Sequence, residues 1–162
     1  MCIRDSLKHQ SNDPYCKGVE ILSIGTELLL GNIVNTNAQW ISEELSTLGL
    51  NHFRQSTIGD NSERITKLIK EISSRSNLLI TTGGLGPTPD DLTTEAIAKS
   101  FNASLFEREY LWDQIKKKLS ISGSSFNRSS LKKQCFFPKD ACLLYTSPSP
   151  RDLSTSRMPS SA

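Results

Sequence analysis

The sequence lacks several features that would place it in other classes of protein. Its four cysteines form no C-x-x-C pair, and its only histidines, His9 and His52, lie far apart, which argues against a structural zinc site. No apolar run reaches the roughly 18 residues that a membrane-spanning helix needs. A formal net charge of +2 predicts no nucleic-acid-binding surface, and the basic clusters at 116–118 and 132–133 fit solvated helix faces. We therefore expect a cytoplasmic protein with reduced thiols that binds neither nucleic acid nor a membrane.

The two ends of the chain carry no core-forming pattern. Residues 1–17 are polar and aperiodic, and residues 142–162 are rich in serine and proline, a composition that buries too little surface to fold. Both ends also resemble translated sequencing-adapter read-through, in MCIRDS at the start and CLLYTSPSPRD near the end. We therefore expect both flanks to be disordered or non-native and a single domain to span residues 18–141.

Between the flanks, strand patterns alternate with helix patterns. Apolar or β-rich runs predict strands over Val19–Ile24, residues 51–58 and Leu78–Thr82. Apolar residues at helical spacing predict helices after Asn35 or Asn37, around residues 65–72, over residues 92–101 and around residues 111–119. Strands that alternate with helices in this way predict an α/β fold, a three-layer α/β/α domain with a mainly parallel sheet.

Three segments leave the predicted strands where an open parallel sheet binds its ligands, beyond the carboxyl ends. They are residues 23–31, residues 58–60 and the Gly-rich loop, residues 81–91. In this loop, Gly83, Gly84 and Gly86 allow backbone conformations that bring successive amides close to an anion. The helix that follows adds the positive end of its dipole. Because the loop matches neither Walker A nor G-x-G-x-x-G, it predicts a phosphate loop of another design.

The carboxylates near these loops have two interpretations each. Asp91 fits the N-cap of the next helix, but two adjacent carboxylates, Asp90 and Asp91, would repel a bound phosphate unless they hold a divalent cation or orient a water. Asp60 begins a D-N-S-E sequence that resembles a capping box, and local physics slightly favours that role. Glu27 follows a strand end and is equally consistent with a functional acid and with a solvated loop residue.

The three segments together resemble a known family. S-I-G-T-E-L-L-L-G at 23–31, I-G-D at 58–60 and T-T-G-G-L-G-P-T-P-D-D-L-T at 81–93 are similar to the molybdopterin-binding (MoaB/Mog-like) domain family, and within it to the N-terminal domain of the competence/damage-inducible branch. The resemblance runs from about Val19 to Ala141. It implies that Asp60 and Asp91 are catalytic, which reverses the local preference at Asp60. It also implies ligand contacts from Thr26, Glu27, Thr82, Gly83, Gly84, Gly86 and Thr88.

The resemblance implies a reaction as well. In the damage-inducible branch, this domain is associated with metal-dependent hydrolysis of the pyrophosphate in ADP-ribose, so we expect a phosphate-containing ligand and a divalent metal cation at Asp90 and Asp91. The alternatives are binding or adenylylation of molybdopterin in molybdenum-cofactor biosynthesis, and a non-catalytic nucleotide-binding module. Fold alone does not decide among the three. We also expect the intact parent protein to be capable of forming a homo-oligomer.

Two departures from the family pattern matter. Many relatives have Asp-Glu where this sequence has Thr26-Glu27. The family also continues beyond residues 137–141 with further strands and a loop of the N-P-x-G-T-A-P-G type, and the deamidase domain of many members has no counterpart in this sequence. We therefore expect a C-terminally incomplete fold with an unpaired apolar sheet edge, marginal stability and little activity for the chain as written.

Overall fold

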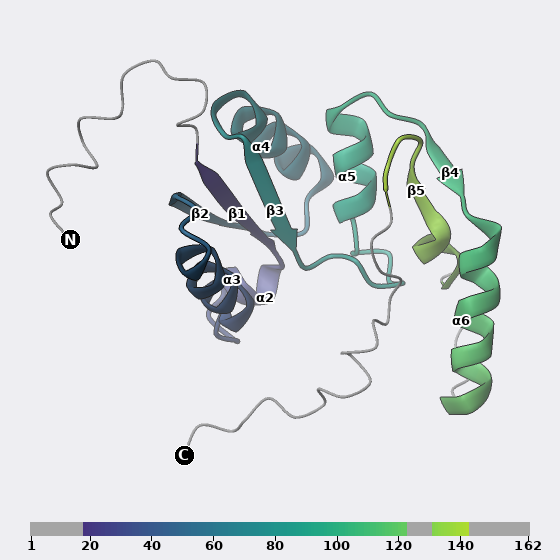
Figure 1. The fold of residues 1–162 in the computed structure, drawn as a ribbon. Helices are drawn as coiled ribbons and strands as arrows, with labels where there is room; N and C mark the ends of the chain where they lie inside the picture. Colours follow the sequence, from purple (N-terminus) through teal and green to yellow (C-terminus); the bar gives the residue numbers. More distant parts are fainter. Residues whose placement is uncertain (1–17, 123–130, 143–162) are drawn as a thin grey trace, which may run out of the picture.

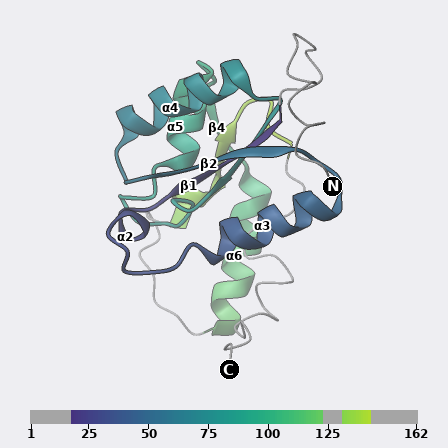
Figure 2. The same ribbon diagram turned by 90° about the vertical axis from the view of Figure 1, so that its left-hand side faces the viewer.

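A three-stranded parallel sheet forms the centre of the computed structural model, which describes residues 18–122 and 131–142. The strand order is β2–β1–β3, with β1 at Val19–Ile24, β2 at His52–Ile58 and β3 at Leu78–Thr82. Helix α3 (Thr36–Thr47) covers one face, and α4 (Ser62–Arg75) and α5 (Thr93–Ser100) cover the other (Figures 1 and 2). The predicted α/β/α layering is confirmed, while the predictions for residues 1–17 and 143–162 lie outside the described residues.

The central strand divides the core into two apolar clusters, because successive side chains of a strand point to opposite faces. Val19 and Ile21 pack against α3. Leu22 and Ile24 pack on the other face with apolar residues of α4 and α5, namely Ile65, Ile69, Ile72 and Ala96. Burial of each such aliphatic side chain contributes roughly 1.5–3 kcal/mol, so both helix layers are held to the sheet chiefly through β1.

Helices α3 and α4 each begin after an asparagine. The Asn35 side chain accepts a hydrogen bond from the Ala38 amide at 3.2 Å, and Gly49 ends α3 with a φ of 70°, which confirms both predicted helix signals. Helix α4 begins after Asn61, whose side chain accepts from the Arg64 amide at 3.0 Å. The capping interpretation of Asp60 is therefore wrong, since its neighbour takes that position.

The capping interpretation of Asp91 is also wrong. Helix α5 begins at Thr93, its N-cap residue is Leu92, and no side chain caps it. The helix thus begins one residue later than the predicted 92–101 range. The physical reason is that the Asp91 carboxylate is already bound inside the preceding loop, as described below, and so does not reach the first amides of the helix.

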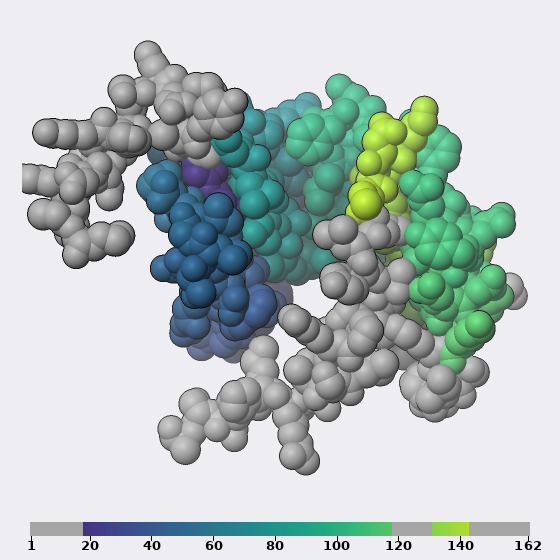
Figure 3. Space-filling model, viewed as in Figure 1, coloured from purple at the N-terminus to yellow at the C-terminus, as the bar shows by residue number. Residues whose placement is uncertain are grey.

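A small second sheet follows α5 and was not predicted. Strands β4 (Leu105–Glu107) and β5 (Phe136–Pro138) pair in the antiparallel sense, and α6 (Glu109–Ser122) confirms the helix predicted around residues 111–119. A short 3-10 helix, η2 (Lys133–Cys135), leads into β5. Figure 3 shows this part of the chain, green to yellow, beside α5 on the side away from β3. Strands of three residues are too short to carry a readable alternation of polar and apolar side chains.

Strands β2 and β3 form the outer edges of the parallel sheet within the described residues. Leu78 at the start of β3 is 46% exposed. The expected unpaired edge is thus present at β3 in this part of the chain. Across residues 18–122 and 131–142, we find no helix with the length and apolar character that a membrane crossing requires.

Candidate functional site

The carboxyl ends of the three parallel strands bring the predicted site segments together. Strand β1 continues through Gly25 into the short helix α2 (Thr26–Leu29), which was not predicted. Strand β2 continues into residues 59–60, and β3 into the Gly-rich loop (Figure 1). The amide of Gly25 donates to the carbonyl of Ile58 at 2.9 Å, so the first two segments remain hydrogen-bonded beyond the paired strands.

Thr26 and Asp60 hold each other across these two segments. The Asp60 Oδ2 atom accepts hydrogen bonds from the Thr26 amide at 2.9 Å and from the Thr26 hydroxyl at 2.8 Å. The Asp60 amide donates in return to Thr26 Oγ1 at 3.2 Å. A Cβ at Gly59 would lie 3.1 Å from the same hydroxyl oxygen, so the glycine permits the close approach. Thr26, predicted to contact the ligand, thus fixes the orientation of the predicted catalytic Asp60.

Glu27 lies exposed at the beginning of α2. Its carboxylate folds back over the strand end, because a Cβ built at Gly25 would lie 2.5 Å from Glu27 Oε1. The glycine therefore leaves room for this carboxylate at the end of β1. Both interpretations of Glu27 remain compatible with that position, and its ligand contact stays a prediction.

A tight turn at Gly83 and Gly84 opens the Gly-rich loop. Their φ values of 86° and 60° lie in the left-handed region, which side chains other than glycine rarely adopt. A Cβ at Gly83 would lie 2.0 Å from the carbonyl oxygen of Ile24, and one at Gly84 would lie 2.4 Å from Thr93 Oγ1. The turn therefore rests directly on the end of β1 and the start of α5.

Buried Thr93 holds this turn and was missed as a site residue. Its hydroxyl donates to the carbonyl of Gly83 at 2.7 Å, and its amide donates to the carbonyl of Gly84 at 3.1 Å. Its position as the last residue of the T-T-G-G-L-G-P-T-P-D-D-L-T motif was the available signal. With two turn carbonyls bonded to Thr93, the conformation of the loop is set by α5.

The Asp91 carboxylate closes the second half of the loop. Its Oδ2 atom accepts from the Thr88 amide at 2.8 Å and also from the Thr88 hydroxyl. Burial by itself would raise the pKa of Asp91, but the hydrogen bonds from the Thr88 hydroxyl and from the Gly86 and Thr88 amides, with the charge of Lys133, lower that pKa below its ordinary value. Asp91 is therefore ionised at neutral pH. Thr88, predicted to contact the ligand, holds Asp91.

A buried polar cluster lies beneath these loops. The hydroxyl of Ser23, on β1, accepts hydrogen bonds from Asn35 Nδ2 at 2.8 Å and from the Thr82 hydroxyl at 3.3 Å. Since Asn35 also caps α3, the cluster joins the start of that helix to the ends of β1 and β3. Ser23 and Asn35 were not predicted as site residues, and Thr82, which was, has its hydroxyl bonded within this cluster.

The segment just before β5 forms an additional wall of the site. Lys133 Nζ donates to the carbonyl of Thr88 at 3.3 Å, and Gln134 Nε2 donates to the carbonyl of Leu85 at 3.2 Å. The prediction of a solvated helix face for residues 132–133 is therefore wrong at Lys133, because the tertiary fold docks this residue on the loop. A cavity of about 380 Å³ lies between the Gly-rich loop and the segment that leads into β5. It is lined by Gly84, Leu85, Gly86, Asp91, Thr94, Glu95, Leu105, Lys132, Lys133, Gln134 and Phe136.

The described residues hold no preformed set of three ligands for the predicted divalent cation. In residues 18–122 and 131–142, no three His, Cys, Asp or Glu side chains lie together in a way that could hold a metal ion. Asp90 is exposed, and Asp91 uses Oδ2 within the loop. Mg²⁺ is commonly held by one or two carboxylates together with substrate phosphates and water, and the cation at Asp90 and Asp91 stays a prediction.

The fold and the site define an α/β domain that carries a Gly-rich loop and two hydrogen-bonded carboxylates, Asp60 and Asp91, at the carboxyl end of a parallel sheet. The model of the family described as "Probable molybdopterin binding domain" matches residues 20–139. The chain belongs to this family, as the motifs predicted.

Similar proteins agree with this assignment. The chain is 90% identical over 142 residues to a CinA-like protein of Prochlorococcus marinus subsp. pastoris (strain CCMP1986 / NIES-2087 / MED4), a match that covers 88% of this chain and 33% of the relative. It is 80% identical over 143 residues to a CinA-like protein of Prochlorococcus marinus (strain MIT 9515), with the same two coverages of 88% and 33%. The crystal structure of the protein CinA from Thermoplasma acidophilum aligns with a TM-score of 0.68 at 32% identity, over 76% of this chain and 71% of that one.

The chain spans about a third of the length of these curated relatives (33%). The 142-residue match is longer than the predicted domain, 18–141, so it takes in some residues of the flanks. The domain boundaries themselves stay a prediction.

Proposed function

We propose that the domain binds a phosphate-containing small molecule at the Gly-rich loop and that the intact parent protein hydrolyses the pyrophosphate bond of a nucleotide of the ADP-ribose type. The observation that carries the proposal is the Gly83–Gly84 turn, whose φ values of 86° and 60° lie in the left-handed region. Successive amides in turns of this kind can form a concavity that binds an anion, and ionised Asp91 belongs to the same loop. The family membership supports a phosphate-containing ligand, and the activity in this proposal goes further than that membership does.

The proposed reaction uses the residues of this site in separate roles. The loop amides hold phosphate oxygens, and Asp60, fixed by Thr26, orients a water for in-line attack on phosphorus. The water oxygen bonds to phosphorus, the bridging P–O bond breaks, and the leaving phosphate takes the electron pair. One proton of the water passes to the Asp60 carboxylate. A divalent cation at Asp90 and Asp91 would neutralise the phosphate charge that these carboxylates otherwise repel.

Two other functions remain candidates. Membership of a family described as molybdopterin-binding favours binding or adenylylation of molybdopterin, whose phosphate the same loop would hold. The same loop and fold would also serve a non-catalytic nucleotide-binding module. The cytoplasmic location and the homo-oligomeric parent stay predictions.

The deciding experiment substitutes Asp91→Asn in the intact parent protein and measures hydrolysis of ADP-ribose with Mg²⁺. We expect turnover to fall by about 100-fold or more, with the thermal unfolding transition preserved. Asp140→Asn, at an exposed aspartate outside the site, is the matched control and should retain full turnover. Normal turnover by the Asp91 variant excludes the mechanism. Binding of ADP-ribose without hydrolysis by the unmodified protein favours the non-catalytic module, and binding of molybdopterin alone favours the second candidate.

A further inference from the structure

Lys133 places a positive charge directly against the Gly-rich loop. Its ammonium nitrogen lies 3.3 Å from the carbonyl oxygen of Thr88 and 3.4 Å from Glu95 Oε1. The side chain keeps 26% of its surface exposed, so it is held on the loop without being sealed from solvent. An ammonium group has three N–H donors, and these two contacts leave one for a further acceptor.

The positive charge of Lys133 offsets the negative charge of the carboxylates in the site. Asp90 and Asp91 belong to the loop whose proposed ligand is an anion, and Asp60 follows β2 at the same end of the sheet. These carboxylates by themselves would repel the anion. Lys133 lines the same cavity of about 380 Å³ as Gly84 and Gly86. A phosphate group in this cavity would therefore meet a lysine ammonium next to the glycine backbone.

The neighbouring lysine has a different environment. Lys132 Nζ lies 2.8 Å from Glu107 Oε1, on β4, and its side chain is 42% exposed. Its ion pair thus ties the segment to the small antiparallel sheet, whereas Lys133 reaches the loop. The pair Lys133–Glu95 is longer, at 3.4 Å, and Glu95 is half exposed with 48% of its side-chain surface accessible. Of the two lysines, Lys133 is the one with a loosely bound counter-ion at the cavity.

We propose that Lys133 is a ligand-binding residue of the phosphate site, and that its ammonium exchanges the contact with Glu95 for a phosphate oxygen of a ligand seated in the cavity between the Gly-rich loop and β5. The inference rests on the proposed function in one respect, namely that the loop binds phosphate. It adds a residue from a segment that sequence patterns assigned to solvent. It also gives Glu95 a defined role as the carboxylate that competes with the ligand.

The test measures binding of inorganic pyrophosphate to the 162-residue chain by titration calorimetry at low and high NaCl. We expect Lys133→Gln to weaken binding about 10-fold, because a charge-assisted hydrogen bond is lost, and to flatten its dependence on salt. Lys116→Gln, the matched control on α6, should bind within about 2-fold of the unmodified chain, since Lys116 lies outside the cavity and its ion pair with Asp113 is exposed. Lys133→Arg should retain most of the affinity.

Glu95→Gln separates ligand binding from a structural role. If Lys133 serves only to anchor the loop to α5, the loss of its counter-ion leaves pyrophosphate affinity unchanged or lower. If it binds the ligand, the loss of the competing carboxylate raises affinity by about 2- to 5-fold, and this gain disappears when Lys133 is also changed to Gln. General repulsion by Glu95, which lines the cavity, would raise affinity in both backgrounds. Urea unfolding of each variant checks that it is folded.

The outcomes distinguish the two proposals. Equal binding by Lys133→Gln and the unmodified chain overturns the role of Lys133 and leaves the phosphate loop standing. Equal losses in Lys116→Gln and Lys133→Gln also overturn it, because they show that binding follows the total charge of the chain and not a local contact. No binding of pyrophosphate by the unmodified chain overturns the phosphate loop itself.

Discussion

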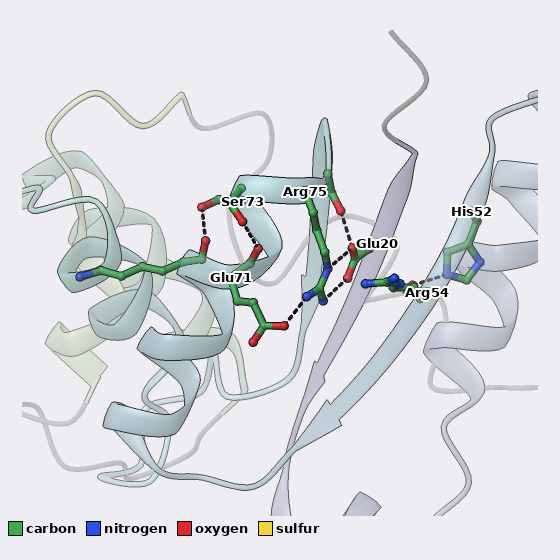
Figure 4. Close-up of polar contacts among 9 residues, drawn as sticks. Glu20, His52, Arg54, Glu71, Ser73 and Arg75 are labelled. Carbon is green, nitrogen blue, oxygen red and sulfur yellow. Dashed lines mark hydrogen bonds and ion pairs between the residues drawn. The ribbon is translucent and has the colours of Figure 1, made fainter. Parts of the chain in front are cut away.

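The two ends of the parallel sheet both hold carboxylates, but they hold them with different partners. At the amino end, Glu20 on β1 is 4% exposed and receives two hydrogen bonds from the Arg75 guanidinium, at 2.7 and 2.8 Å (Figure 4). Ser76 donates to the same carboxylate at 2.5 Å, and Arg75 also pairs with Glu71. The carboxylate is matched by a cation from the end of α4, so this cluster ties a helix to the central strand.

At the carboxyl end, Asp60 and Asp91 are held by uncharged donors. Thr26 binds Asp60, and Thr88 with the Gly86 amide binds Asp91. Hydroxyl and amide donors orient a carboxylate without cancelling its charge, which leaves it able to act on a water or a cation. The partner, and not the residue type, thus distinguishes a carboxylate whose charge is neutralised by a cation from one whose charge is left available.

The largest loss of stability is expected at the amino end of the sheet. Arg75→Ala leaves the buried Glu20 without its cation and should lower the free energy of unfolding by about 3–5 kcal/mol. Urea denaturation of the chain measures it. The double variant Glu20→Leu/Arg75→Met removes both charges and should recover most of the loss. A loss below about 1 kcal/mol for Arg75→Ala would mean that this ion pair is no stronger than an exposed one.

A smaller loss of stability is expected at the carboxyl end from Gly83→Ala. The new Cβ would lie 2.0 Å from the carbonyl oxygen of Ile24, at a φ of 86°. We expect a loss of roughly 2–4 kcal/mol, from the left-handed conformation and a forced backbone shift, together with loss of phosphate binding. Gly49→Ala is the control, because its φ is 70° and no atom lies within 4 Å of its Cβ. It should cost only about 1 kcal/mol and spare binding. Equal losses in both variants would contradict a close contact at Gly83.

The smallest expected change is in how the free energy of unfolding depends on pH in the acid range. Hydrogen bonds from Arg75 lower the pKa of Glu20 below its ordinary value of 4.5, against the opposing effect of burial. The pKa of Asp91 is lowered too, where burial is outweighed by Thr88 and the loop amides. A lowered folded-state pKa gives stability that is present above the unfolded value and is lost as the pH falls through the folded value.

The two ends of the sheet should therefore both weaken in acid, and single variants separate them. Glu20→Gln should flatten the fall in unfolding free energy below pH 4.5, and Asp91→Asn should flatten the fall below pH 3.8, both measured by urea denaturation across the acid range. Glu20→Gln should have the larger influence, because Glu20 is bound by a full positive charge. A steeper acid dependence in either variant would show that the sign of the corresponding pKa shift is wrong.

Much of the fold could be predicted from the sequence because long periodic segments carry their own signal. The strands β1, β2 and β3 and the helices α3 to α6 were predicted close to where they occur, and the Asn35 cap was readable from local rules. The short elements α2, β4 and β5 were not, because three or four residues hold no complete period. Local capping rules gave the wrong role to Asp60 and Asp91, since each rule considers only the nearest amides.

The sequence by itself determined the layers of the domain, the place of the Gly-rich loop at the end of a strand, and the family to which the chain belongs. Only the tertiary structure decided the partners of the charged groups. Thr26 and Asp60 are 34 positions apart and Lys133 and Thr88 are 45 apart, yet both pairs are hydrogen-bonded. The physical reason is that burial and hydrogen bonding depend on distance in space, which periodicity along the chain does not encode.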